Sequence, residues 1–93
     1  MQEIYQDLLD RVSRLYERRG ALARAIGYCK KQLQTDPLLE TAHQRLMTLY
    51  AQRGMRSEAL RTYEACREIL LKELEAEPDA VTTAIFRRIQ ESH

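Results

Sequence analysis

The sequence repeats itself with a period of 34 residues. A shift of this length superposes residues 15–25, LYERRGALARA, on residues 49–59, LYAQRGMRSEA. Both segments read L-Y-x-x-R-G-x-x-x-x-A, and the same shift pairs Arg11 with Arg45. Periods of this size are typical of stacked repeat proteins, in which each unit buries its hydrophobic face against its neighbours. We therefore expect two copies of one structural unit, over about residues 6–39 and 40–77 of a single domain that spans residues 1–93.

Each unit is predicted to be a helical hairpin. Apolar residues recur at three- and four-residue spacing on both sides of a glycine, Gly20 in the first unit and Gly54 in the second. Glycine adopts the left-handed conformation that commonly ends a helix. Ala25 and Ala59 then place a small side chain where the second helix of each unit crosses the first, so that the two backbones can approach closely. Four helices in two antiparallel hairpins follow from this pattern.

Prolines mark the ends of both units. Pro37 fits the first turn of a helix, and Asp36 before it is expected to cap that helix. No helix-breaking residue interrupts the last helix of the second unit before Pro78, so this helix is expected to be longer than its counterpart in the first unit. After Pro78, Asp79 is expected to cap a closing helix over about residues 79–91. The positions that define the repeat are Tyr16, Gly20, Ala25, Pro37, Tyr50, Gly54, Ala59, Tyr63 and Pro78.

The charge balance gives no field that would recruit nucleic acid or an anionic membrane. Fifteen Lys and Arg against fourteen Asp and Glu leave a net charge of +1. The N-terminus carries Glu3, Asp7 and Asp10 where a signal peptide needs basic residues and then an apolar core. With two cysteines, the chain has no disulfide framework of the secreted kind. We expect a cytoplasmic protein that recognises its partner through local surface.

No constellation of residues indicates catalysis. The sequence contains no phosphate-binding glycine loop, no H-E-x-x-H and no G-x-S-x-G. Cys29 and Cys66 match no metal-binding spacing and are interpreted as buried core thiols. His43 is interpreted as a packing residue, and His93 is the only other histidine. We therefore predict no enzymatic activity, no cofactor and no metal.

The 34-residue unit resembles the tetratricopeptide repeat over residues 6–73, because Tyr, Gly, Ala and Pro stand at the offsets of that family. This resemblance implies an all-α fold with two tetratricopeptide-like hairpins and a terminal helix in a right-handed superhelical stack. The first helices of such hairpins line a groove that can hold a peptide or a partner helix. The polar residues expected to line a partner groove here are Arg11, Arg14, Arg18, Gln44, Arg45, Thr48 and Gln52.

A narrower resemblance covers the C-terminal two thirds of the chain. Residues 36–40 (DPLLE), 58–63 (EALRTY) and 77–82 (EPDAVT), with an aromatic residue at Phe86, are similar to the bacterial transcriptional activator domain. Glu75 stands where that family has a glycine, and we expect the helix to continue there by about a turn. The resemblance implies a helical regulatory domain of a bacterial transcription factor. In that family a winged-helix DNA-binding domain usually accompanies it, and none is recognised in these 93 residues.

The predicted function is a noncatalytic protein-interaction or oligomerisation module. Its partner is expected to be a protein or another domain of a parent chain, and direct binding of nucleic acid is not expected. Ile4, Tyr5, Leu8 and Leu9 on the first helix are expected to face a neighbour, and a second copy in a homodimer is one candidate. The alternative is a free-standing tetratricopeptide-type scaffold or adaptor unrelated to transcription.

Overall fold

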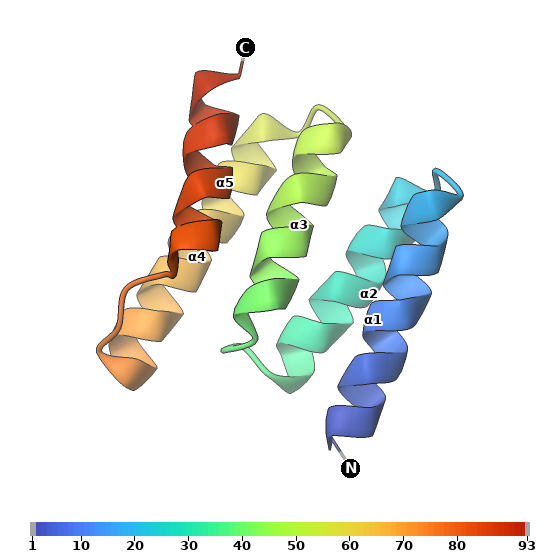
Figure 1. Cartoon of the computed structure of the whole chain (residues 1–93), viewed down its shortest axis with the longest axis horizontal. Coiled ribbons are helices and arrows are strands. Elements are labelled where there is room, and N and C mark those ends of the chain that lie inside the picture. The colour runs from blue at the N-terminus through green and yellow to red at the C-terminus, as the bar shows by residue number, and fades with distance from the viewer. Residues whose placement is uncertain (1, 93) are drawn as a thin grey trace.

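The protein is all-helical over residues 2–92, which are the residues that the computed structural model describes (Figure 1). Within this range there are five helices and no strand. Their bounds are α1 (Gln2–Arg18), α2 (Leu22–Thr35), α3 (Glu40–Gln52), α4 (Arg56–Leu74) and α5 (Ala80–Glu91). Helices α1 and α2 form one antiparallel hairpin, α3 and α4 form a second, and α5 follows as a single helix (Figure 1). The predicted all-α fold is confirmed.

The helices lie in two layers. Helices α1, α3 and α5 are nearer the viewer in Figure 1, and α2 and α4 lie behind them. Helix α3 packs on α2 of the preceding hairpin, and α5 packs on both α3 and α4. Helix α5 therefore occupies the place that the first helix of a third unit would take. The right-handed sense of the superhelix stays a prediction.

The two hairpin corners have the same backbone structure. Gly20 and Gly54 adopt left-handed conformations, with φ values of +78° and +75°. At each corner the N–H after the glycine donates to a tyrosine carbonyl one turn back, that of Tyr16 at 2.9 Å and that of Tyr50 at 2.8 Å. This pairing satisfies carbonyls that a helix end would otherwise leave without partners. The recurring glycine at the corners thus has a geometric cause.

The core lies between the two layers. Ala25 and Ala59, the small residues predicted at the helix crossings, are both fully buried. Met47 of α3 and the two cysteines are equally buried, so the inter-layer space is filled by small and flexible side chains. Helix α5 joins this core through Ile89 and through the Phe86 ring, which stacks on Tyr63 of α4 with the ring centroids 3.8 Å apart.

The start of α3 differs from the sequence-based expectation. The helix begins at Glu40, so Pro37 lies in the preceding turn and not in the first turn of the helix. The carboxylate of Asp36 accepts a hydrogen bond from the N–H of Leu38 at 3.1 Å. Asp36 therefore closes a turn of the Asx type and does not cap the helix, because its side chain bonds its own backbone two residues on.

The end of α4 also corrects the expectation of continuation. The helix ends at Leu74, and Glu75 adopts a left-handed conformation with a φ of 51°. The prediction that this helix continues to residue 77 is therefore wrong. The prediction that it is longer than its counterpart is confirmed, because α4 has 19 residues and α2 has 14. Glu75 takes the conformation for which glycine is the usual residue. The predicted cap of the closing helix is confirmed, because the Asp79 carboxylate accepts from the N–H of Thr82 at 2.9 Å.

None of the described helices is both long enough and apolar enough to cross a membrane.

Candidate functional site

A shallow hollow of about 240 Å³ opens on the layer of first helices. Helices α1, α3 and α5 all contribute to it, so it crosses both hairpins and the closing helix. Its lining residues are Arg14, Glu17, Gln44, Arg45, Thr48 and Ile85. Four of the seven residues predicted to line a partner groove are therefore brought together: Arg14, Gln44, Arg45 and Thr48. We call this hollow the groove.

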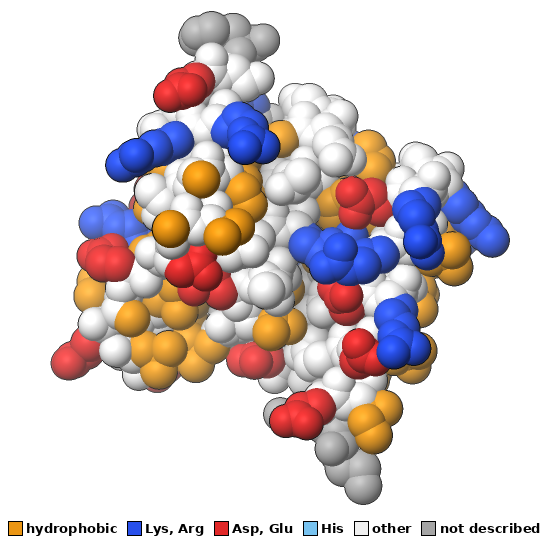
Figure 2. Space-filling view, viewed as in Figure 1, with side chains coloured by type: hydrophobic (Ala, Val, Ile, Leu, Met, Phe, Trp, Pro, Cys, Tyr) orange, Lys and Arg blue, Asp and Glu red, His pale blue; other side chains and the backbone are white. Residues whose placement is uncertain are grey.

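The groove continues into a basic hollow on α1. Arg11, Arg14, Glu17 and Arg18 line this second space of about 460 Å³. Figure 2 shows basic side chains gathered over α1 on the same face as the groove. Gln52, the remaining predicted groove residue, is exposed near the end of α3 and lines neither hollow.

Arg45 has a structural role that the sequence did not reveal. Its side chain is only 10% exposed, and its guanidinium reaches back from α3 to the first hairpin. It pairs with Glu17 at 2.5 Å and donates to the hydroxyl of Ser13 at 2.7 Å. Since the guanidinium is already bound inside the protein, Arg45 forms the floor of the groove and is not available as a free ligand-binding group.

Gln44 likewise serves the junction between α3 and α5. Its amide donates to the hydroxyl of Thr82 at 2.9 Å and to the carboxylate of Asp79 at 3.3 Å. Glu40, one turn earlier on α3, accepts from the N–H of Asp79 at 2.7 Å and from the Thr82 hydroxyl. Thr82 is fully buried in this network. These hydrogen bonds fix α5 across the end of the groove.

The charged side chains that remain accessible lie on α1. Arg14 is 57% exposed and donates to Asp10 at 2.8 Å, a hydrogen bond that raises the pKa of the guanidinium. Arg11 pairs with Asp7 at 3.1 Å, with both side chains largely exposed. Exposed ion pairs of this kind are weak and exchange partners readily. Arg11, Arg14 and Arg18 can therefore turn from their helical neighbours to an incoming carboxylate.

An acidic hollow lies at the other end of α1. It has a volume of about 570 Å³ and extends to the turn before α3. Its lining residues are Glu3, Gln6, Asp7, Asp10, Arg14, Gln32, Asp36, Leu39 and Thr41. Sequence reasoning missed this hollow, although Glu3, Asp7 and Asp10 stand at the spacing of one helix face. Asp36 could not have been added from sequence, because the turn brings it there.

The cysteines and His43 are held inside the fold. Burial raises the pKa of the Cys66 thiol to about 12, and burial also raises the pKa of Cys29 despite the nearby Ser13 hydroxyl and Arg45. Both thiols are free and stay protonated at neutral pH. His43 donates from Nε2 to the carbonyl of Pro37 at 2.9 Å, which fixes the turn before α3.

The geometry offers no metal site within residues 2–92. No three His, Cys, Asp or Glu side chains in that range are grouped so that they could hold a metal ion. His93 lies outside the described residues.

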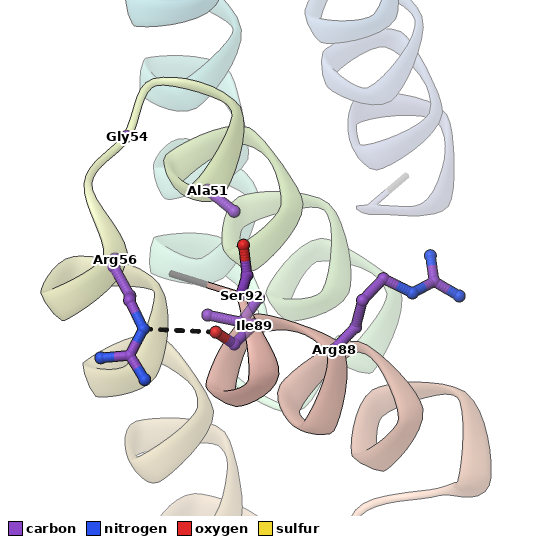
Figure 3. A pocket seen from close by; sticks show the side chains of 6 residues that line it. All are labelled: Ala51, Gly54, Arg56, Arg88, Ile89 and Ser92. Carbon is purple, nitrogen blue, oxygen red and sulfur yellow. Dashed lines mark hydrogen bonds between the residues drawn. The ribbon is translucent and has the colours of Figure 1, made fainter.

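A further hollow of about 370 Å³ lies between the second hairpin corner and the end of α5 (Figure 3). Arg56 donates there to the carbonyls of Ile89 and Gln90, at 3.3 and 3.1 Å, and so caps the C-terminus of α5. A similar hollow lies between the first corner, residues 20–24, and Arg53 at the end of α3. Both hollows are junctions between a hairpin corner and the end of the next first helix, so they are products of the repeat.

Comparison with known proteins agrees with this architecture. The family model of the bacterial transcriptional activator domain matches residues 2–90, almost the whole chain. The search of individual curated proteins found no match. A match of this extent, on a chain that folds into two stacked helical hairpins and a closing helix, shows that the protein belongs to the bacterial transcriptional activator domain family.

Proposed function

We propose that this domain is a noncatalytic protein-interaction module that regulates a bacterial transcription factor in the cytoplasm. The observation that supports the proposal most strongly is the groove, which is lined by one side chain or more from each of α1, α3 and α5. In stacked helical repeats such a surface accommodates an extended peptide or a helix. The partner is another protein or another domain of a parent chain.

The charges around the groove define the chemistry of the partner. Three arginines and one glutamate surround the basic hollow, which favours acidic side chains. Four carboxylates and one arginine surround the acidic hollow, which favours basic side chains. A segment that carries acidic residues at one end and basic residues at the other would match both. Because both signs of charge occur side by side and the net charge is +1, the domain is not suited to bind the phosphate backbone of DNA directly.

Site-specific photo-crosslinking in the source bacterium tests the proposal. A photoreactive residue replaces Thr48 in the groove, and a control protein carries it in place of the exposed Arg67 on α4. We expect a defined protein adduct from position 48 that is reduced strongly when Arg14→Glu and Arg18→Glu are added, and none of that adduct from position 67. Equal adducts from both positions, or no adduct from the groove, would overturn a partner-binding role for this surface.

The identity of the adduct separates the two functional alternatives. A component or domain of the transcription machinery supports the regulatory role. A partner without any link to transcription would instead favour a free-standing scaffold, because the same fold serves many unrelated interactions.

A further inference from the structure

Helix α1 carries a hydrophobic face that its equivalent in the second unit buries. Under the 34-residue shift, Leu8 corresponds to Ala42 and Leu15 to Leu49. Ala42 and Leu49 are each 1% exposed in α3, which packs on α2 of the first hairpin. Leu8 and Leu15 are 56% and 39% exposed in α1. The same helix position therefore packs on a neighbour in one unit and is open in the other.

The open face is continuous along α1. Ile4 and Tyr5 extend it toward the N-terminus and are 73% and 46% exposed. Residues 4, 5, 8, 12 and 15 follow the three- and four-residue spacing of one helix face. Figure 2 shows hydrophobic side chains along this outer edge of the molecule, away from the groove. Exposed apolar stripes of this kind mark interaction surfaces.

Arg11 gives independent evidence that no described residue covers this edge. Its equivalent, Arg45, reaches across to the preceding hairpin and is 10% exposed. Arg11 occupies the same position in α1 but is 76% exposed, and its guanidinium pairs with Asp7 of its own helix. The first unit thus has both the apolar stripe and the arginine of a stacking surface, and nothing within residues 2–92 packs on them.

The charges of α1 identify the occupant. Three of its four acidic residues, Glu3, Asp7 and Asp10, lie before residue 11, and the fourth, Glu17, is paired with Arg45 of α3. All of its basic residues lie from residue 11 onward: Arg11, Arg14 and Arg18. A second α1 laid antiparallel to the first sets each acidic half against a basic half. A parallel arrangement would set like charges opposite one another. The helix is therefore complementary to itself in one orientation only.

We propose that two copies of this domain associate through an antiparallel pair of α1 helices. The two-fold axis passes near residue 9, so that Asp7 of each copy lies opposite Arg11 of the other, and the apolar residues form the centre. This association goes beyond the proposed groove function. Its apolar contact uses the outer edge of α1, whereas Asp7 and Arg11 also line the acidic and basic hollows beside the groove. The partner is a second copy of this chain, which contributes the same face of its own α1.

The size of the contact sets the expected affinity. A helix of 17 residues is about 26 Å long. A single helix pair of that length buries less than the roughly 800 Å² per partner that stable complexes bury. We therefore expect association in the micromolar range or weaker, which calls for measurements up to about 500 μM.

Sedimentation equilibrium of the wild type and two matched variants tests the surface. Leu8→Glu places a charge in the proposed contact, and Leu74→Glu places one at an equally exposed leucine at the end of α4. Since both leucines are more than half exposed, both variants are expected to fold, and circular dichroism checks this. We expect a concentration-dependent dimer for the wild type and for Leu74→Glu, and at least a tenfold weaker dimer for Leu8→Glu. A wild type that stays monomeric to about 500 μM, or a Leu8→Glu variant that dimerises normally, overturns the proposal.

A charge exchange tests the orientation. Asp7→Lys and Arg11→Glu each set like charges across the proposed axis, so each variant alone should dimerise more weakly than the wild type. An equimolar mixture of the two restores opposite charges at both contacts, and we expect it to form a heterodimer close to wild-type affinity. Failure of the mixture to associate better than either variant alone would overturn the antiparallel arrangement. Leu8 lines none of the hollows described above, so a groove adduct at Thr48 that persists in Leu8→Glu separates the two proposals.

Discussion

Replacement of Arg45 by Met is the sharpest test of how the two hairpins are held together. Methionine keeps the apolar length of the side chain and removes only the guanidinium. The lost contacts are the ion pair with Glu17 at 2.5 Å, a longer one with Asp10 at 4.0 Å, and the hydrogen bonds to Ser13 at 2.7 Å and to the Cys29 thiol at 3.3 Å. All of them cross from α3 to the first hairpin, so the change weakens the contact between hairpins and leaves each hairpin intact.

The expected loss of stability follows from how deeply Arg45 and Glu17 are buried. Breaking a fully buried pair costs about 3–5 kcal/mol, and an exposed pair contributes about 0–1 kcal/mol. Arg45 is 10% exposed and Glu17 33% exposed, so this pair lies between those limits. After the change Glu17 can turn to solvent, and Ser13 keeps its hydrogen bond to the carbonyl of Ala25 at 2.8 Å. We expect the free energy of unfolding to fall by about 2 kcal/mol.

Urea unfolding followed by circular dichroism measures this loss. The matched control is Arg14→Met, which removes an ion pair to Asp10 whose arginine is 57% exposed. We expect the free energy of unfolding of Arg14→Met to be less than about 0.5 kcal/mol below that of the wild type. In about 1 M salt this difference should disappear, because salt screens the exposed ion pair. The reasoning would be refuted if Arg45→Met were as stable as the wild type, or if the two variants lost the same amount.

Four further predictions follow from particular residues. Glu75→Gly should raise the free energy of unfolding by about 0.5–1 kcal/mol in urea titrations, because glycine adopts a φ of 51° without strain; a loss of stability would contradict the left-handed helix end. Ala59→Leu should cost about 1–3 kcal/mol in the same assay, because Ala59 is fully buried where helices cross, and an unchanged midpoint would show that the crossing has spare room. Because the folded-state pKa of Cys66 is raised from its ordinary 9.0 to about 12, its thiolate forms first in the unfolded chain, so stability should be intact below pH 9 and fall as the pH rises toward 12. Cys66→Ala should flatten that fall in pH-dependent melting curves, and an unchanged slope would count against the burial of the thiol. A gel-shift assay with the isolated domain should show no complex with duplex DNA at physiological salt, whereas a salt-sensitive shift would contradict the partner chemistry proposed for the groove.

The repeat pattern predicted the four helices of the two hairpins, and Pro78 with Asp79 predicted the closing helix. Gly20 and Gly54 mark corners in the sequence because the conformation at a hairpin corner is local and favours one residue type. Ala25 and Ala59 are informative for a similar reason, since only a small residue fits a close helix crossing. Asp79 could be recognised as a cap because its partner, the N–H of Thr82, is three residues away.

The sequence did not predict correctly where α3 begins and where α4 ends. Asp36 has two local uses, as a helix cap or in an Asx turn, and sequence alone does not choose between them. Glu75 has a side chain that favours helix continuation, and the fold imposes the left-handed conformation on it. The family pattern has a glycine at that position, and a glutamate there was wrongly interpreted as continuation of the helix.

The sequence predicted several of the residues that line the groove, but it did not predict the ion pair that buries one of them. Helical spacing placed Arg14, Arg45 and Thr48 on first helices, and the structure brings them to one hollow. The burial of Arg45 depends on Glu17, which is 28 residues away in sequence, and such a pair is visible only once the hairpins are stacked. Arg11 and Arg45 have the same place in the repeat and opposite environments, because within residues 2–92 only Arg45 has a hairpin before it to reach.

We propose that the groove of this domain regulates transcription through a protein partner. The most direct measurement is the transcript profile of a strain that lacks the gene and is complemented with the wild type, with Arg14→Glu/Arg18→Glu, or with the control Arg67→Glu/Lys72→Glu. The control carries the same change in charge on α4, outside the groove. We expect the wild type and the control to restore the profile, and the groove variant, present at equal abundance, not to restore it. Full restoration by the groove variant, or a deletion that changes no transcripts, would contradict it.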